Sequence, residues 1–567
     1  MTTASFDAGL WRRRLAVALR QAPADLVLTG ARIVNVFTGE LERANIAIVD
    51  GRIAAIGDYA DGLETLDLTG RIVAPSFIDA HLHLESSLLW ASEFARAVVP
   101  HGTGGVITDP HEIANVCGLA GIDAVRRATA GLPLHIRFTI PSCVPASEHE
   151  SSGARLDADE IAAALGWPES VGLGELMNFP GVIDGTDLIA SKLAAAAGRR
   201  IDGHSPHVRG DALQAYAGSG PASDHEATTY DEAREKLRLG LMIMIREGTT
   251  EHNLLDLLPL VTDRTYPRCC FSSDDRDCHD LLHHGHLDDT LRKAVRAGLD
   301  PVRAVRMATW NVANYWRLDG IGAIAPGYEA NLVVLEDLTG FKVEQTIFQG
   351  QVVARDGALI VDLPSSPAPA LFHDTVRTGP IMLRNLRLDP AHATQAIQII
   401  PGQIVTKLID VEPRVVNGQA VSDPSRDLLK IVSVERHTAS GRVGVGLARG
   451  FGLARGALAS TIAHDAHNIV AIGVDDGDML AAIATVADSQ GGLAVVADGR
   501  VVAHLPLPIA GLLSDRPLAD VAAAYAELEA AARTLGSQLP SPFGLLAFMS
   551  LSVIPAARVT DRGFLRV

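Results

Sequence analysis

The chain lacks the features that would place it in a membrane or among disulfide-bonded secreted proteins. No hydrophobic run reaches the roughly 18 apolar residues that a membrane-spanning helix needs. There are only five cysteines, an odd number without a C-x-x-C pair, so no disulfide framework is expected. Arg12–Arg14 precede an apolar stretch that Arg20 soon interrupts, which does not fit a signal peptide. We therefore expect a cytoplasmic protein that does not associate with a membrane.

Positive charge is also in short supply. The sequence has 49 Lys and Arg residues against 67 Asp and Glu residues, which gives a formal net charge of −18. Nucleic acids and anionic membrane surfaces bind proteins through basic patches. No basic run interleaved with aromatic residues occurs. Nucleic acid is therefore not an expected partner.

What the sequence does contain is enough apolar material for several domains. It has 567 residues, 47% of them hydrophobic, which suggests roughly three or four domains. Short strand-like segments fill the first part, where Asp50-Gly51 is typical of a hairpin, and predict a small antiparallel sheet. A similar texture returns after Gly320, so both flanks of the middle segment are expected to build one split β-sandwich domain. The expected division is 1–74 with 320–365 for this domain, 75–319 for a barrel, and 370–567 for a C-terminal α+β domain.

The middle segment alternates apolar strands with helical stretches. Such alternation over this length is typical of a (β/α)₈ barrel, so the predicted fold class is α/β. The chemistry of that fold lies at the carboxyl ends of the strands. The expected strand ends are His83, Asp109, Pro145, Asn178, His207, Glu226, Gly248 and Asp275.

Two histidines one residue apart mark the first of these strand ends. Side chains alternate along a strand, so His81 and His83 point the same way and could share a metal ion. Any one such histidine could equally be a hydrogen-bonded core or surface residue. Further candidate donors follow at later strand ends: the nitrogens of His204 and His225 and the oxygens of Glu175 and Asp274. Asp275 is an alternative to Asp274. Four nitrogen and two oxygen donors suit a pair of divalent manganese, iron or zinc ions.

The same residues resemble the amidohydrolase superfamily, metal-dependent hydrolases built on such a barrel. Within it, the chain is similar to the bacterial adenine deaminases. The motifs that carry this similarity are Phe77–Ser87, Asp109–Val116, Gly172–Asn178, Gly203–Pro206, Ser223–Glu226, Arg246–Gly248, Asp274–Arg276 and, in the C-terminal part, Ala463–Asn468 and Leu505–Leu512.

The resemblance implies a hydrolytic deamination of adenine to hypoxanthine and ammonia, as in purine salvage, by a hydroxide that bridges two metal ions. Manganese is the first choice, with iron and zinc as alternatives. The ligands would be His81 and His83 for one ion, His204 and His225 for the other, Glu175 as the bridge, and Asp274. The further catalytic roles fall to Asp274, which would accept the hydroxide proton, and to a proton donor to N1 of adenine, with Glu112 as the first choice and Asp109 and His111 as the other candidates. Candidates for reading the purine ring are Ser205, His207, Asp224, Glu226 and Glu247. A homo-oligomer is expected, with a dimer as the first choice.

Several alternatives stay open. One is a related hydrolase that acts on another aminopurine or on a cyclic amide or urea; the latter commonly carry a carboxylated lysine where this chain has Glu175. Another is a metal-free barrel with an assembly role, although such relatives lose ligands. Glu112 could instead be a carboxylate that stabilises a helix N-terminus. His464, Asp465 and His467 either cap the active site or hold a domain interface. The H-x-E and P-C-x-x-C deaminase scheme is excluded, because no P-C-x-x-C occurs.

Overall fold

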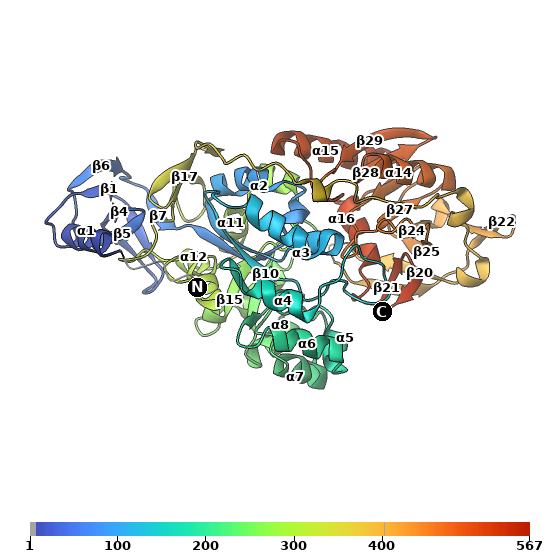
Figure 1. Cartoon of the computed structure of the whole chain (residues 1–567), viewed down its shortest axis with the longest axis horizontal. Helices are drawn as coiled ribbons and strands as arrows, with labels where there is room; N and C mark the ends of the chain where they lie inside the picture. The colour runs from blue at the N-terminus through green and yellow to red at the C-terminus, as the bar shows by residue number, and fades with distance from the viewer. Residues whose placement is uncertain (1–6, 402) are drawn as a thin grey trace.

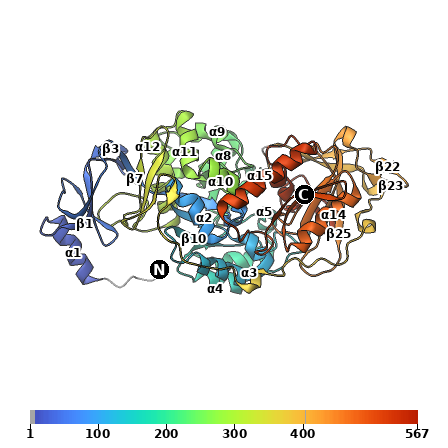
Figure 2. The same cartoon turned by 90° about the horizontal axis from the view of Figure 1, so that it is seen from above.

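The protein consists of three parts that follow one another along its longest axis. The computed structural model describes residues 7–401 and 403–567. Figure 1 shows the N-terminal strands at one end, the parallel strands and their helices in the middle, and the C-terminal part at the other end, and Figure 2 shows the same order from above. Within the described residues, no helix is both long and apolar enough to cross a membrane.

The N-terminal region forms two sheets after helix α1 (Ala8–Ala18). One has the strand order β5-β4-β1-β6 and the other the order β19-β18-β17-β16-β7-β2-β3. Their bounds are β1 Ala24–Thr29, β2 Arg32–Asn35, β3 Glu40–Arg43, β4 Asn45–Val49, β5 Arg52–Gly57, β6 Gly62–Asp67, β7 Ile72–Pro75, β16 Leu332–Leu335, β17 Val343–Phe348, β18 Gln351–Arg355 and β19 Ala358–Leu359. Because β7 pairs with β16, strands from both flanks of the middle segment share one sheet.

Local turn chemistry explains one hairpin of this region, while the strand directions differ from the expectation. Asp50 and Gly51 both have positive φ and connect β4 to β5 with Val49 paired to Arg52, as a type I′ turn requires. The predicted hairpin is confirmed. The expectation of a purely antiparallel sheet is wrong, since β6 and β7 run parallel to β1 and β2, respectively. Parallel pairing needs a crossover, and here intervening strands of the other sheet supply it.

The middle segment contains eight parallel strands arranged in two sheets. Five have the order β12-β11-β10-β9-β8, and three have the order β13-β14-β15. Their bounds are β8 Phe77–Leu82, β9 Thr103–Thr108, β10 His135–Ile140, β11 Ser170–Leu173, β12 Arg200–Ile201, β13 Ser223–Asp224, β14 Met242–Arg246 and β15 Cys269–Ser272. The helices of this segment include α2 Ala91–Val98, α3 His111–Ala128, α4 Ala158–Leu165, α6 Asp187–Ala195, α7 Gly210–Gly218, α8 Tyr230–Arg238, α10 Cys278–His283, α11 Leu287–Arg296, α12 Pro301–Met307 and α13 Trp310–Trp316.

Backbone contacts join the first and last of these strands at their carboxyl ends. The amide of Asp274 donates to the His81 carbonyl, and the amide of His83 donates to the Asp274 carbonyl, each at 3.1 Å. At the other side, the Ala222 amide donates to the Ile201 carbonyl at 3.0 Å, next to β12 and β13. The polar residues that follow β8 and β15 are therefore neighbours, although they lie far apart in the sequence.

Several strands end earlier than predicted. β10 ends at Ile140 rather than Pro145, and β12 ends at Ile201 rather than His207. β11 ends at Leu173, because Asn178 caps helix α5 (Phe179–Ile183) by accepting the Gly181 amide at 2.9 Å. In each case the polar residues after the apolar run belong to the loop that follows the strand.

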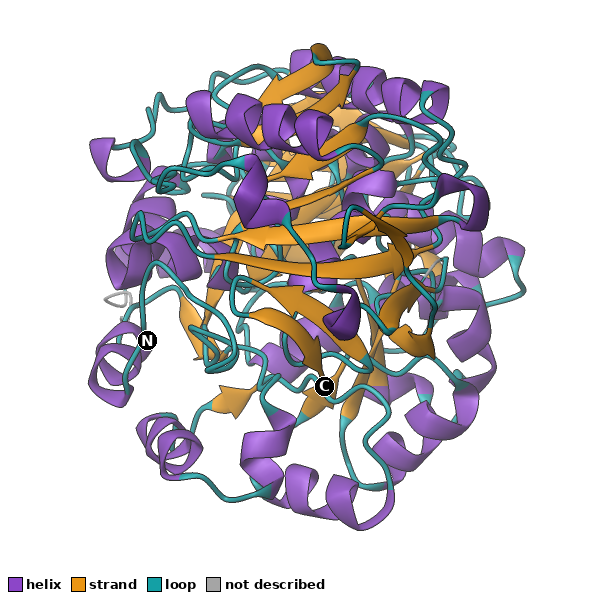
Figure 3. Cartoon of the chain, turned by 90° about the vertical axis from the view of Figure 1, so that its right-hand side faces the viewer, coloured by secondary structure: helices purple, strands orange, loops and turns teal. Residues whose placement is uncertain are grey.

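The C-terminal part is an eight-stranded mixed sheet with helices packed on it. The strand order is β21-β20-β25-β24-β27-β26-β28-β29. Figure 3 views the molecule from the side of the C-terminal part, with strands in the centre of the picture and helices around them. The bounds are β20 Gln395–Ile399, β21 Thr406–Asp410, β24 Leu428–Val434, β25 Val443–Arg449, β26 Ala457–Ser460, β27 Ile469–Gly473, β28 Gly492–Ala497, β29 Arg500–Pro506, α14 Asp476–Asp488 and α15 Leu518–Thr534. Helix α15 packs against α10 and α2 of the middle segment, and one buried hydrophobic cluster runs through both parts. Apolar burial therefore fixes the C-terminal part beside the ends of the parallel strands.

Candidate metal centre and active site

The two histidines of β8 are oriented by hydrogen bonds on their outer nitrogens. His81 Nδ1 lies 2.7 Å from Asp202 Oδ2, and His83 Nδ1 lies 2.9 Å from the carbonyl oxygen of Asp109. With each Nδ1–H donated outwards, both Nε2 atoms present lone pairs to the centre, where they are 3.3 Å apart. Metal-binding histidines in proteins have this arrangement. Sequence reasoning missed Asp202, whose position directly after β12 was its only signal.

Glu175 lies between two pairs of histidines. Its Oε1 is 3.3 Å from His83 Nε2, while its Oε2 is 3.1 Å from His225 Nε2 and contacts His204 Nδ1. The Glu175 backbone is fixed by Asp109, whose Oδ2 accepts the Glu175 amide at 2.8 Å. A side chain at Gly174 would clash with that same carboxylate, so glycine is required before Glu175. One carboxylate thus faces both histidine pairs with different oxygens, which is the geometry of a bridging ligand.

Asp274, and not Asp275, lies closest to the β8 histidines. Asp274 Oδ1 is 3.2 Å from His83 Nε2 and 3.4 Å from His81 Nε2. Its Oδ2 accepts a hydrogen bond from Arg246 Nη1 at 2.8 Å. Asp275 accepts a hydrogen bond from Ser86. Arg246 also contacts Glu226, so a buried guanidinium orients the carboxylate; the sequence showed this arginine in a motif without indicating its role.

The donor atoms fit a pair of first-row divalent ions. Tetrahedral bonds of 2.0–2.2 Å place ligand atoms about 3.3 Å apart. The distances from Nε2 of His81, His83 and His225 to the carboxylate oxygens are between 3.1 and 3.4 Å, while His204 Nδ1 lies closer to Glu175. Three donors meet in each of the groups His81, His83, Glu175 and Glu175, His204, His225. His204 and His225 face Glu175 through Nδ1 and Nε2, respectively. Their other ring nitrogens are buried without a hydrogen-bond partner among residues 7–401 and 403–567, so these two rings lack the outward hydrogen bonds that orient His81 and His83. Ligand type alone does not select the metal.

The site keeps its carboxylates ionised despite burial. Burial opposes ionisation of Glu175, yet the neighbouring imidazoles of His204 and His111 lower the pKa of its carboxyl well below the usual value. Burial likewise opposes ionisation of Asp274, but His81, His83 and Arg246 lower its pKa well below the usual value. Asp109 differs, because burial raises its pKa to about 6. Ionised Glu175 and Asp274 are the states that bind cations.

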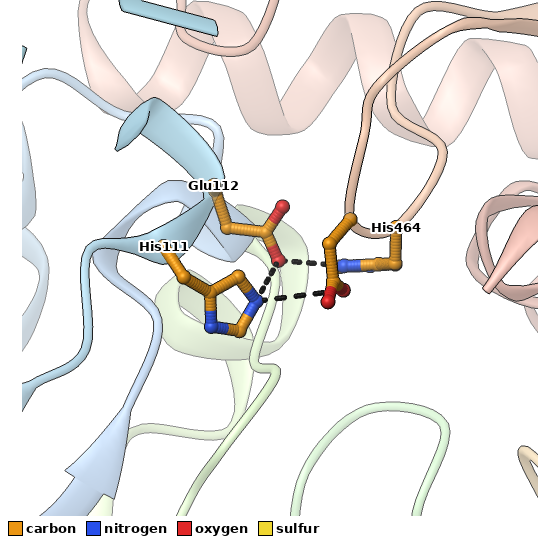
Figure 4. A group of neighbouring side chains, drawn as sticks. His111, Glu112 and His464 are labelled. Carbon is orange, nitrogen blue, oxygen red and sulfur yellow. Dashed lines mark hydrogen bonds and ion pairs between the residues drawn. The ribbon is translucent and has the colours of Figure 1, made fainter. Parts of the chain in front are cut away.

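A second group of polar side chains adjoins this centre from the start of α3. Figure 4 shows His111 and Glu112 of α3 facing His464 of the C-terminal part. Glu112 Oε1 lies 3.2 Å from His111 Nε2 and 2.6 Å from His464 Nδ1, and His111 Nε2 lies 3.5 Å from Asp465 Oδ1. All four residues are buried. The C-terminal residues thus lie at the active-site edge and at the domain interface at once.

Two adjoining cavities open beside these groups. The inner one is lined by polar residues of the centre together with Met177, Phe548 and Leu551. The outer one is larger and has mostly apolar walls that include Tyr525 and Phe543. Both share Asp275, His464 and Phe548, and the Phe548 ring stacks on His464 with centroids 4.4 Å apart. The two cavities therefore meet beside the donor cluster.

Most of the residues considered for reading a substrate lie elsewhere. Ser205 donates to Asp224, and that carboxylate pairs with the buried Lys236. The His207 side chain is half exposed and pairs with Glu232. Of the residues considered, only Glu226 lines the inner cavity. Glu247 pairs with Lys293 instead.

Comparison with known proteins agrees with this geometry. Residues 72–353 match the family model described as amidohydrolase family, and residues 403–567 match the adenine deaminase C-terminal domain. A curated adenine deaminase of Dehalococcoides mccartyi is 47% identical over 97% of this chain and 96% of its own length. One of Oleidesulfovibrio alaskensis is 45% identical over 98% of this chain and 96% of its own length.

Solved structures resemble the chain more distantly. A β-aspartyl dipeptidase of Fervidobacterium islandicum is 13% identical with a TM-score of 0.45, covering 60% of this chain and 99% of that one. The family assignment therefore rests on the sequence relatives, which align along nearly the whole chain. The amidohydrolase match includes every donor of the two histidine pairs, and the C-terminal match includes His464 and Asp465. The chain therefore belongs to the adenine deaminase family of amidohydrolases.

Proposed function

We propose that this protein is an adenine deaminase that converts adenine and water to hypoxanthine and ammonia. The observation that carries the proposal is the position of Glu175 between the His81–His83 and His204–His225 pairs. The relatives named adenine deaminase align with this chain over nearly their whole length. A water oxygen would add at C6, N1 would be protonated, and the amino group would leave as ammonia. We further propose that the two parallel sheets form one (β/α)₈ barrel, with the donors at its rim.

The donor set would hold two divalent ions, with manganese as the first choice. Such ions lower the pKa of water towards 7 and so provide a hydroxide nucleophile at neutral pH. His81, His83 and Asp274 would bind one ion, His204 and His225 the other, and Glu175 both. Asp202 and Asp109 would fix the ligands through the hydrogen bonds described above.

Proton transfers would fall to the carboxylates around the cavity. Asp274 would accept the proton of the attacking water, since Arg246 holds its other oxygen and aims it at the β8 histidines. Glu112 stays the first choice as proton donor to N1, with Asp109 and His111 as the other candidates. The two carboxylates differ in surroundings, because Glu112 faces three imidazoles, whereas Asp109 accepts an amide from the backbone of Glu175. A cytoplasmic location and a homodimer also stay predictions.

The test is release of ammonia from adenine by the purified full-length chain loaded with manganese. We expect turnover of adenine and little turnover of cyclic amides or ureas under the same conditions. Release of ammonia from other aminopurines but not from adenine would change the assigned substrate and leave the deamination reaction unchanged. Turnover of a cyclic amide without any ammonia from adenine would contradict the proposal.

A further inference from the structure

The side chains that join α3 to the C-terminal part form a donor cluster separate from the proposed dinuclear centre. Four residues contribute one ligand atom each, all within 4.8 Å of one another: His111, Glu112, His464 and Asp465. None of them belongs to the six donors described above. Figure 4 shows the barrel residues of this cluster and His464 converging from opposite sides of the domain interface.

The spacing of these atoms resembles that of the dinuclear donors. His111 Nε2 lies 3.2 Å from Glu112 Oε1 and 3.5 Å from Asp465 Oδ1. Ligand atoms around a tetrahedral first-row ion are about 3.3 Å apart. Two imidazole nitrogens and two carboxylate oxygens are a donor set that zinc, manganese and iron accept.

The cluster also contains a buried polar atom that its own contacts leave unpaired. Asp465 Oδ2 has no hydrogen-bond partner in the described part of the chain. The Asp465 side chain is only 2% exposed. Burying a charged oxygen without a partner is costly, so this atom beside three further donors indicates a missing cation.

A third imidazole is placed to support the cluster from outside. His467 Nδ1 accepts the Ala463 amide at 3.2 Å, so a neutral His467 ring carries its proton on Nε2. That Nε2 lies against Glu112 Oε2, the oxygen that points away from the other donors. A ligand carboxylate held in this way through its second oxygen is typical of metal sites.

We propose that His111, Glu112, His464 and Asp465 bind a third divalent first-row metal ion, distinct from the dinuclear pair. The ion ties the C-terminal part to α3. It also lies one imidazole away from the bridging carboxylate, because His111 Nδ1 is 3.1 Å from Glu175 Oε1. A cation bound by Glu112 and His111 removes both from the candidate proton donors and leaves Asp109 in that role.

The competing explanation is a set of ion pairs between the two carboxylates and protonated imidazoles. Metal counting separates the two. The full-length chain would be stripped with a chelator, titrated with Mn²⁺ alone, and counted by elemental mass spectrometry. We expect three bound ions per chain, two for Asp465→Asn, and three for the matched control His504→Asn, whose ring lies elsewhere in the C-terminal part and contacts Ser489.

Two ions in the wild-type chain would overturn the proposal, and so would three in Asp465→Asn. Because the wild-type count needs no variant, the test stands even if Asp465→Asn fails to fold. A crystal of the manganese-loaded wild-type chain provides a second readout, since anomalous scattering must peak between Glu112 and Asp465. The adenine assay is independent: a two-ion chain that deaminates adenine overturns only the third site.

Discussion

The two donor clusters differ in how the chain assembles them. Every donor of the proposed dinuclear centre lies at or just after the carboxyl end of a parallel strand of one segment, and these strand ends set their positions. The second cluster combines the start of α3 with a loop of the C-terminal part, and only domain packing brings His111 and Asp465 together. The first cluster is therefore built into one scaffold, whereas the second depends on an interface.

The second cluster differs from an ordinary interface contact in whether its buried carboxylate oxygens have hydrogen-bond partners. Glu329 joins the N-terminal sheets to β10, and both its oxygens are paired: Oε2 with His135 and Asn331, and Oε1 with Arg52. At the opposite interface, Asp465 retains an unpaired buried oxygen. A carboxylate that only holds domains together can be fully paired within this protein, so the unpaired oxygen of Asp465 is better explained by a bound cation.

The largest expected effect comes from removing the bridge of the first cluster. Glu175→Ala should lower deaminase activity on the order of 10³-fold or more, since a metal centre supplies several kcal/mol of transition-state stabilisation. Metal content should fall in parallel, because Glu175 faces both histidine pairs. Glu235→Ala is the control, as this glutamate is on the surface and pairs with Arg209. Unchanged activity and metal content in Glu175→Ala would place the centre elsewhere.

A smaller loss should follow from disturbing a ligand without removing it. Asp202 holds His81 through Nδ1 at 2.7 Å. Asp202→Asn should weaken metal binding by about 10- to 100-fold, as is usual for partners of ligating histidines. Competition with a chelator measures this affinity. Asp211→Asn, on the exposed side of α7, should bind metal as the wild type does. Equal affinities for the two variants would deny Asp202 its orienting role.

A substitution at Phe548, beside the domain interface, should affect substrate binding more than metal binding. Phe548 lines both cavities and stacks on His464. Phe548→Leu should raise the KM for adenine by about two- to tenfold, the equivalent of one aromatic contact of roughly 0.5–1.5 kcal/mol. Metal content should not change. Phe543→Leu, which borders only the outer cavity, should raise KM less. A fall in kcat with an unchanged KM would contradict a role in binding adenine.

The sequence predicted the first cluster because its donors recur at the ends of successive strands. Each follows a strand that can be recognised from its apolar residues, so order along the chain predicts position around the sheet edge. The closing contact between Asp274 and His83 followed from the same order. The strand ends were less predictable, since Asn178 caps helix α5 and the loop residue His207 is held by a tertiary hydrogen bond from its amide to Glu232.

The second cluster could not be assigned in the same way. His464 and Asp465 stood out as a motif, but no periodicity relates a C-terminal loop to the first turn of α3. Their meeting with Glu112 results from the apolar packing of α15 on α10 and α2, which sequence patterns do not specify. Arg246 and Asp202 were missed for a related reason: each acts through another residue, and that contact exists only in the folded chain.

The smallest expected effect tests the paired interface that serves as the reference for this comparison. Burial alone would raise the pKa of Glu329, but hydrogen bonds from His135 and Asn331 and the charge of Arg52 lower it to about 2. A carboxylate with a depressed pKa stabilises the fold above its unfolded pKa, about 4.5, and loses that contribution as the pH falls towards 2. Glu329→Gln should therefore lower the free energy of unfolding at pH 7 by about 1 kcal/mol, a value reduced for partial exposure. In urea titrations the difference from the wild type should stay constant down to about pH 4.5 and then shrink. Metal content should be that of the wild type, because Glu329 lies at the opposite interface from Glu112. A difference that grows as the pH falls, or a lost ion, would remove the distinction between a contact that only joins domains and one that binds a cation.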